Sequence, residues 1–185
     1  DSIYFVEPGG NGIVIAGFCS YPIMISNCQI DECHENGILL DFENSTSTWL
    51  TVTDTQIKAY KSAIFFRNAQ DIIVSNCHIA ASQLSTCNQT IAYFENVYRV
   101  QLDNCLIKNL SNQTRNCVEL NDSCYCHVAN CQVDHSIGGA ENVDFAIKET
   151  GTRSNVNQIV NNICVGISNG AAFAYGANSV NQNNI

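Results

Sequence analysis

The sequence predicts an all-β solenoid in which units of about 26 residues each wind once around a common axis as three short strands. A motif of an apolar residue, any residue, Asn, Cys, any residue and an apolar residue occurs four times: ISNCQI (25–30), VSNCHI (74–79), LDNCLI (102–107) and VANCQV (128–133). A second apolar pattern recurs between these copies at steps of 25 to 28 residues. Apolar and polar residues alternate inside the segments, which is the period of a half-buried strand. One unit cannot bury its own inner face, but stacked units can.

The first strand of each unit is the second apolar pattern, seen in GILLDF (37–42) and AIFFRN (63–68). Its regular spacing indicates that equivalent side chains of successive units lie over one another. We expect one inner column from the first apolar residue of each copy: Ile13, Ile38, Ile64, Ile91, Val118, Phe145 and Phe173.

The second and third strands meet at an Asn or a related residue. Asn adopts a left-handed backbone more readily than other non-glycine residues, so it suits a sharp corner between two strands. Stacked Asn side chains can also hydrogen-bond to one another along the axis. The residues expected at this corner are Asn27, Asp54, Asn76, Asn104, Asn130, Asn162 and Gln182.

The third strand begins with an inward residue that is usually Cys, namely Cys28, Thr55, Cys77, Cys105 and Cys131. Cys in such a column acts as a small buried hydrophobe. The chain has 11 cysteines, an odd number, and many occupy this one inward position. We therefore expect reduced, buried thiols, because the chain is also long enough to build a core without disulfides.

The IxxNCxI…GIxL units match the short repeat profile of the pectate-lyase-like superfamily, and the resemblance covers nearly the whole chain. The resemblance implies a right-handed single-stranded parallel β-helix of about seven coils, each of three short strands, in a single domain over 1–185. Phage tailspikes and tail appendages are among its members. The fold hosts lyases, hydrolases, epimerases and passive rods, so it does not decide the activity.

The two ends of the chain show neither a capping helix nor a polar cap, so we expect a piece of a longer chain or ends covered by something else. A net charge of −9 without a basic cluster argues against nucleic acid and anionic membranes. The chain has no apolar run of 18 residues, which predicts no membrane insertion.

Outward residues of the first strand form a mostly apolar strip, predicted as Val14, Leu39, Phe65, Ala92, Glu119, Ala146 and Ala174. In pectate lyases this face carries acids, basic residues and calcium ligands, and the strip departs from that pattern. A contiguous apolar strip is typical of an interface, so we expect packing against sister subunits in a homotrimer. The alternative is a strip covered by its own loops or left solvated.

A column at the end of the first strand places three carboxylates on consecutive coils: Glu95, Asp122 and Glu149 follow Phe42 and Asn68 and precede Ala177. Neighbouring strands predict about 5–6 Å between the Glu95 and Asp122 carboxyls, which is the range of retaining glycosidases. With the nearby Glu119, these residues are the catalytic candidates for cleaving a glycan. A solvated turn or a Ca²⁺ site are the alternatives; no other cofactor and no zinc site is expected, since Cys126 and His127 point to opposite faces.

A polar ladder on the outer face of the third strand predicts glycan hydrogen bonding by Gln29, Gln56, His78 and Gln132. Two flanking loops add Asp31 and His34 in one coil, and Asp134 and His135 three coils away. That separation is roughly 14 Å at strand spacing, too far for one catalytic pair. Simple solvation of these side chains is the alternative.

The features together favour a tailspike-like module on a virion tail, made in the host cytoplasm, that binds a bacterial surface polysaccharide with or without hydrolysing it. A structural spacer in a trimeric fibre is the second hypothesis. A stand-alone, extracellular polysaccharide lyase or epimerase is the third. Enzyme activity is left open.

Overall fold

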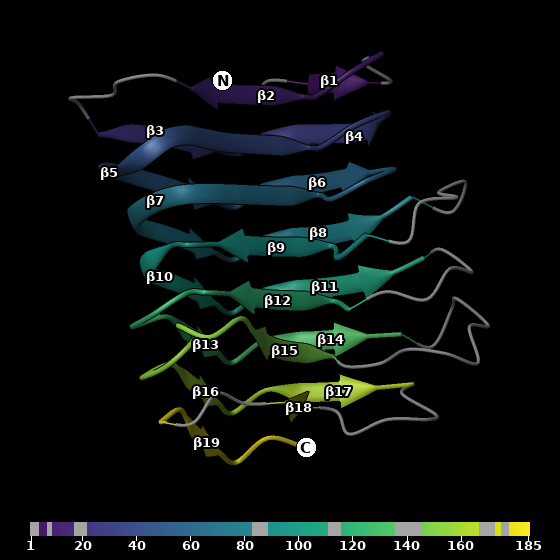
Figure 1. Cartoon of the computed structure of the whole chain (residues 1–185). Coiled ribbons are helices and arrows are strands. Elements are labelled where there is room, and N and C mark those ends of the chain that lie inside the picture. Colours follow the sequence, from purple (N-terminus) through teal and green to yellow (C-terminus); the bar gives the residue numbers. More distant parts are fainter. Residues whose placement is uncertain are drawn as a thin grey trace.

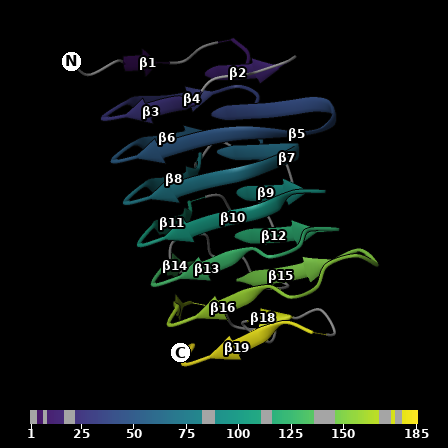
Figure 2. The same cartoon turned by 90° about the vertical axis from the view of Figure 1, so that its left-hand side faces the viewer.

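The computed structural model describes residues 4–6, 9–16, 22–82, 89–110, 116–135, 146–166, 173–174 and 178–185. They form two parallel β-sheets that wrap around one core, and the turns stack in chain order from the N-terminal to the C-terminal end (Figures 1 and 2). The described residues include no helix, and so none that could cross a membrane. The predicted all-β parallel solenoid is therefore confirmed.

Each turn consists of a first, a second and a third strand. The first strands are β2 (Ile13–Ala16), the start of β5 (Ile38–Thr53), the start of β7 (Ile64–Ser75), β9 (Ala92–Glu95), β12 (Val118–Asn121), β15 (Ile147–Thr150) and β18 (Phe173–Ala174). The second strands are β3 (Ile23–Ser26), the ends of β5 and β7, β10 (Tyr98–Asp103), β13 (His127–Ala129), β16 (Gln158–Val160) and β19 (Val180–Gln182). The third strands are β1 (Tyr4–Val6), β4 (Gln29–Cys33), β6 (Gln56–Ala59), β8 (His78–Ala81), β11 (Leu106–Asn109), β14 (Gln132–Asp134) and β17 (Ile163–Val165).

Two details differ from the predicted coils. β5 and β7 run through the corner between the first and second strands, which joins these strands into one twelve-stranded sheet, while the third strands form a separate seven-stranded sheet. The complete turns are also fewer than the predicted seven, because β1 at one end and β18 with β19 at the other belong to incomplete turns.

The inner column of the first strand is confirmed for Ile13, Ile38 and Ile64, which lie in register. In the next turn Ala92, and not the predicted Ile91, aligns with Ile64 and Val118. Ile147 aligns with Val118 in the turn that follows, and the predicted Phe145 lies outside the described residues. In β9 the predicted register is wrong by one residue, and keeping it would turn the buried Phe94 outward. In β15 Ile147 lies two residues after Phe145, so the same face is inward but every pairing moves by two residues.

The Asn corner between the second and third strands is left-handed at every level, with φ between 51° and 55°. The residues at this corner are Asn27, Asp54, Asn76, Asn104, Asn130, Asn161 and Asn183. The prediction is confirmed for the first five and is wrong by one residue for Asn162 and Gln182. The side chains form the expected ladder: Asn104 Nδ2 donates to Asn76 Oδ1 at 2.7 Å, and Asn183 Nδ2 donates to Asn161 Oδ1 at 3.2 Å.

The inward column after this corner is buried as predicted, and its members are Cys28, Thr55, Cys77, Cys105 and Cys131. Asn162 occupies the same position in the next turn, where it is fully buried. Its Oδ1 accepts from the backbone N of Cys131 at 2.9 Å, and its Nδ2 donates to the backbone O of Val128 at 3.0 Å. A buried amide is tolerated here because these bonds replace those with water.

The cysteines that the structure describes are all free, and all but Cys164 are buried; Cys19 and Cys87 lie outside the described residues. Burial raises the pKa of Cys33 to about 11 and that of Cys126 to about 12.

The apolar centre between the sheets includes the edge-to-face pair Phe66 and Phe94, whose ring centroids are 5.7 Å apart.

We predict that Asn104→Val destabilises the protein by about 2–3 kcal/mol. The variant forces a β-branched residue into a left-handed backbone and removes the hydrogen bond to Asn76. Asn104→Gly is the matched control, because glycine accepts this backbone and only the side-chain bond is lost, at about 1 kcal/mol. Urea unfolding compares the two variants; equal losses would contradict a backbone role for Asn104.

We predict that stability falls as the pH rises above about 9. An unfolded thiol ionises near pH 8.5, whereas the buried thiols of Cys33 and Cys126 keep their protons to about pH 11 and 12. Between these values the unfolded state binds fewer protons than the folded state, so alkali favours unfolding. The contribution of these two protonated thiols to the free energy of unfolding is therefore complete below pH 8.5 and is lost as the pH rises toward 11 and 12.

Urea unfolding in reductant at pH 7.5, 9 and 10.5 measures this dependence. Cys126→Ala should flatten it, because one of the protected thiols is gone. Stability that is constant or higher at pH 10.5 would rule out the explanation.

Candidate functional site

The outer column of the first strand is less apolar than the mostly apolar strip that the sequence predicts. The register gives Val14, Leu39, Phe65, Tyr93, Glu119, Lys148 and Ala174. Ala92 and Ala146, which were expected on this face, are both buried. The column is thus apolar and aromatic over its first turns and becomes charged at Glu119. The homotrimer inferred from the strip stays a prediction.

An open hollow of about 360 Å³ lies on this face, and we call it the Tyr93 hollow. Its lining residues are Ser62, Phe65, Gln89, Thr90, Tyr93 and Glu95. The rings of Phe65 and Tyr93 lie 5.3 Å apart at 37° and form its aromatic wall. Hydroxyl, amide and carboxylate groups therefore surround an aromatic surface, which is the composition of a site for a polar ligand with apolar faces.

Two neighbours hold the aromatic wall in place. Asn121 Nδ2 donates to the hydroxyl of Tyr93 at 2.9 Å. The Arg67 guanidinium lies 5.9 Å from the Phe65 ring centre and makes a two-pronged ion pair with Asp41, at 2.8 and 2.5 Å. Burial raises the pKa of Tyr93, and the nearby charges of Glu95 and Glu119 act in the same direction. The Tyr93 hydroxyl is consequently neutral at physiological pH.

Glu119 is fixed by three hydrogen bonds, two of which come from neighbouring turns. Its Oε2 accepts from Thr90 Oγ1 at 2.8 Å and from Asn116 Nδ2 at 2.9 Å, while its Oε1 accepts from Thr150 Oγ1 at 2.9 Å. Both carboxylate oxygens are engaged, so Glu119 orients Thr90 at the edge of the Tyr93 hollow.

The predicted stack of Glu95, Asp122 and Glu149 is wrong in register. Glu95 pairs with Asn121, and Glu149 pairs with the inward Leu120. Asp122 lies in the corner after the first strand, with φ 49°, where its Oδ1 accepts from the backbone N of Arg153 at 2.9 Å. The three carboxylates therefore take three different places: the outer face, the corner and the interior.

Glu149 is the interior member, with only 8% of its surface exposed. Its Oε1 accepts from Ser179 Oγ at 2.7 Å and from Asn157 Nδ2. These donors satisfy the buried carboxylate near the C-terminal end of the stack. The catalytic assignment of Glu95, Asp122, Glu149 and Glu119 stays a prediction, and only Glu95 lines the Tyr93 hollow.

The polar ladder on the third strands is aligned as predicted, because Gln29, Gln56, His78, Leu106 and Gln132 occupy one register position. Burial lowers the pKa of His78, and the charges of Lys108 and Lys58 lower it further. Its Nε2 is shielded from solvent and has no hydrogen-bond partner among the described residues. His78 is therefore neutral at pH 7 and is a poor candidate for glycan contact through that nitrogen.

Asp31 and Asp134, which were expected in loops, lie in β4 and β14 and make contacts within the chain. Asp31 lies 3.8 Å from Lys58, and Asp134 lies 3.9 Å from Lys108. His34 packs edge-to-face on Tyr60, with ring centroids 5.2 Å apart. His135 was expected in a surface loop, but it is only 2% exposed and its Nε2 lies 2.7 Å from Asn109 Nδ2. It is part of the interior and cannot reach a glycan. Glycan binding by the others stays a prediction.

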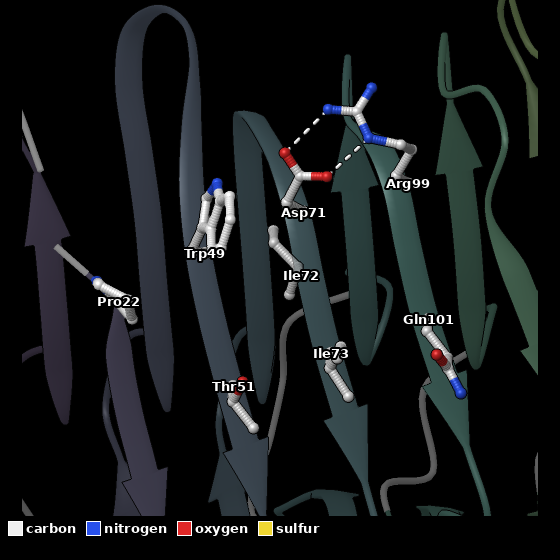
Figure 3. A pocket seen from close by; sticks show the side chains of 8 residues that line it. All are labelled: Pro22, Trp49, Thr51, Asp71, Ile72, Ile73, Arg99 and Gln101. Atoms are coloured by element: carbon white, nitrogen blue, oxygen red, sulfur yellow. Dashed lines mark hydrogen bonds and ion pairs between the residues drawn. The ribbon is translucent and has the colours of Figure 1, made fainter. Parts of the chain in front are cut away.

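A second hollow of about 360 Å³ lies on the outer face of the second strands, where the sequence predicted no site (Figure 3). We call it the Trp49 groove, and its lining residues are Pro22, Trp49, Thr51, Asp71, Ile72, Ile73, Arg99 and Gln101. They come from β5, β7 and β10 and from the residue that precedes β3. Trp49 is the only tryptophan of the chain, which is the one signal in the sequence that could have directed attention here.

The described residues include no group of three or more His, Cys, Asp or Glu that could hold a metal ion. The carboxylates for which Ca²⁺ was the alternative take different places in the turns, and the Ca²⁺ site stays a prediction.

Comparison with known families gives one match, a family described as "Right handed beta helix region", over residues 11–185. No curated protein and no solved structure matches the chain significantly.

We predict that Glu119→Leu destabilises the protein by about 2–4 kcal/mol, since it leaves three donors without an acceptor. Glu119→Gln should cost less than about 1 kcal/mol, because the amide oxygen can replace Oε2 and the amide nitrogen can donate to the Thr150 hydroxyl. Urea unfolding at pH 7 measures both, and a large loss in the glutamine variant would show that the charge itself is required.

Proposed function

The chain belongs to the right-handed β-helix family, and from that premise we propose that it is a polysaccharide-binding module whose binding surface is the Tyr93 hollow. The fold supports a polysaccharide-binding or a structural role in general. The observation that carries the proposal is the Phe65–Tyr93 aromatic wall, with Glu95, Thr90 and Gln89 around it. A sugar ring presents apolar C–H groups on its faces and hydroxyls at its rim, so it matches a wall of rings bordered by polar groups.

The side chains of the Tyr93 hollow are pre-positioned for such a ligand. Asn121 fixes the Tyr93 hydroxyl, Glu119 fixes the Thr90 hydroxyl, and Asp41 fixes Arg67 beside Phe65. Groups that are already held lose little conformational entropy on binding. The carboxylate of Glu95 and the amide of the exposed Gln89 then provide directional hydrogen bonds to sugar hydroxyls.

Binding, and not cleavage, is the activity that these observations favour. Glycoside hydrolysis needs two carboxyl groups that face the same glycosidic bond. Of the four carboxylates predicted to act together, Glu149 is interior, Asp122 lies in the corner, and Glu119 already accepts three hydrogen bonds. Of this set, only Glu95 lines the hollow.

We further propose that the polysaccharide belongs to a bacterial surface, as the resemblance to phage tailspikes and tail appendages implies. A purely structural spacer would leave the Tyr93 hollow without a ligand. The two hypotheses therefore differ in a measurable way.

We predict that Tyr93→Ala and Phe65→Ala each weaken polysaccharide binding at least tenfold, because each removes one ring of the aromatic wall. Purified capsular polysaccharides and O-antigens are first screened as an immobilised array. Those that bind are then titrated in solution by calorimetry, which measures the affinity of each variant. Glu95→Gln should weaken binding less than either ring variant does. Neither this variant nor the wild type should shorten the glycan. If the wild type shortens it and Glu95→Gln does not, cleavage is established.

Tyr60→Ala is the matched control, since it removes an aromatic ring that packs on His34 and does not line the Tyr93 hollow. Urea unfolding checks that every variant is folded. Absence of binding to all polysaccharides by the folded wild type would refute the proposal and favour a structural spacer.

A further inference from the structure

The Trp49 groove is bordered by a row of residues with an unusual backbone. The row lies on successive turns at the corner between the first and second strands: Trp49, Asp71 and Arg99 lie within β5, β7 and β10, while Tyr125 and Val156 lie two residues before β13 and β16. All five are left-handed, with φ from 46° to 62°. The register of Leu50 with Ile72, and of Ile72 with Val100, places the first members side by side. Two bridges, from Tyr98 to Cys124 and from Cys124 to Asn155, extend the row to Tyr125 and Val156.

The residue types in this row are not those that the backbone favours. At the Asn corner the same left-handed conformation is filled by Asn or Asp at every level. Trp, Arg, Tyr and Val cost roughly 1–2 kcal/mol each in this conformation relative to a right-handed one. Residues kept in a costly backbone conformation tend to occur at functional sites. The fold needs the bend but not these side chains, so the presence of Trp49, Arg99 and Tyr125, which are aromatic or can donate hydrogen bonds, indicates a role for their side chains.

The side chains of the row combine two exposed rings with a charged pair between them. Trp49 is 62% and Tyr125 is 59% exposed. Between them, Arg99 Nε and Nη2 donate to the two carboxylate oxygens of Asp71 at 2.6 and 2.8 Å, and Nη2 also donates to Gln70 Oε1 at 3.0 Å. Three strand spacings separate the two rings, about 14 Å.

The side chains that line the groove form two lines, and in the second line polar and apolar residues alternate from one turn to the next. Figure 3 shows Trp49, Asp71 and Arg99 along one side and Thr51, Ile73 and Gln101 along the other. Successive members of each line come from successive turns, so the groove runs parallel to the solenoid axis. A long, narrow ligand fits this arrangement better than a compact one.

We propose that the Trp49 groove is a second saccharide-binding site, distinct from the Tyr93 hollow, which takes a linear, uncharged glycan laid along the solenoid axis. The rings of Trp49 and Tyr125 stack on sugar faces, and Asp71, Arg99, Gln70 and Gln101 exchange hydrogen bonds with sugar hydroxyls. Asp71 and Arg99 neutralise each other, and the chain carries a net charge of −9, so neither local nor overall charge favours an anionic glycan.

A second copy of the chain is a weaker occupant for this groove. From Pro22 to Tyr125 the surface of the groove covers five successive turns. Its area is about 200 Å², from a length of roughly 20 Å and a width of roughly 10 Å. Stable protein interfaces bury about 800 Å² on each partner. The Asp71–Arg99 pair also interrupts the apolar surface at its centre, where interfaces are depleted of charge.

Because Trp49 is the only tryptophan, its fluorescence reports on this groove alone. Titration of the wild type with maltohexaose, cellohexaose, laminarihexaose and chitohexaose should give a saturable change in emission with at least one of them. A hexamer of galacturonic acid, which is linear but anionic, should bind at least tenfold more weakly.

Trp49→Asn is the decisive variant, because Asn suits the left-handed backbone and the protein should unfold at the same or a higher urea concentration. Calorimetry should show at least tenfold weaker binding of the responding hexasaccharide, whereas Trp49→Phe keeps a ring and should retain most of the affinity. Val156→Asn is the matched control: it makes the same backbone improvement one level beyond Tyr125 and should leave binding unchanged.

Tyr93→Ala should leave the tryptophan response intact, which separates this site from the Tyr93 hollow. The proposal is overturned if none of the four neutral hexasaccharides changes the emission, if Trp49→Asn binds as tightly as the wild type, or if only the anionic hexamer binds. Concentration-dependent association that Trp49→Asn abolishes would assign the groove to a second copy and equally overturn it.

Discussion

The left-handed backbone at one residue per corner is the constraint on which the rest of this solenoid depends. A chain that must turn sharply between the second and third strands at every level can do so only with residues that tolerate positive φ, and Asn or Asp occupies this position seven times. The same Asn side chains then bond to one another along the axis, as in the 2.7 Å bond from Asn104 to Asn76. Each corner thus fixes both the direction of the next strand and its level relative to the neighbouring turn.

Register decides the chemistry of every outer face of this molecule. Because side chains alternate along a strand, a shift of one residue exchanges the buried and exposed sets. In β9 this shift brings Tyr93 outward and Ala92 inward. In β15 the difference is two residues, so the faces are kept, but Lys148 and not Ala146 lies beside Glu119. What would have been a ladder of three carboxylates becomes an aromatic wall beside a single carboxylate. The change favours recognition of a glycan over its hydrolysis.

The two hollows lie on adjacent faces and share a design. In each, aromatic and polar side chains lie next to an Arg–Asp ion pair: Arg67 with Asp41 beside Phe65, and Arg99 with Asp71 on the turns that follow Trp49. A solenoid offers repeated, rigid positions on each face, so binding residues can be added without disturbing the core. Both proposed ligands are saccharides for the same reason, namely that rings bordered by fixed polar groups suit a molecule with apolar faces and a hydroxyl rim.

The sequence by itself determined the parallel solenoid, its repeat length, the Asn corner from Asn27 to Asn130 and the inward cysteine column, because these follow from local periodicity and backbone preference. It also placed Gln29, Gln56, His78 and Gln132 in one ladder. Where Asn161 and Asn162 are adjacent, either could take the corner, and only packing showed that Asn162 is inside, where it bonds to Cys131 and Val128.

The tertiary structure alone decided the register of β9 and β15, the burial of His135 and the row that begins at Trp49. These depend on contacts between turns about 26 residues apart, and on a corner where Trp, Arg and Tyr adopt a backbone that their own preferences oppose. No local pattern contains that information, because the cost of the conformation is met by the packing of the neighbouring turns.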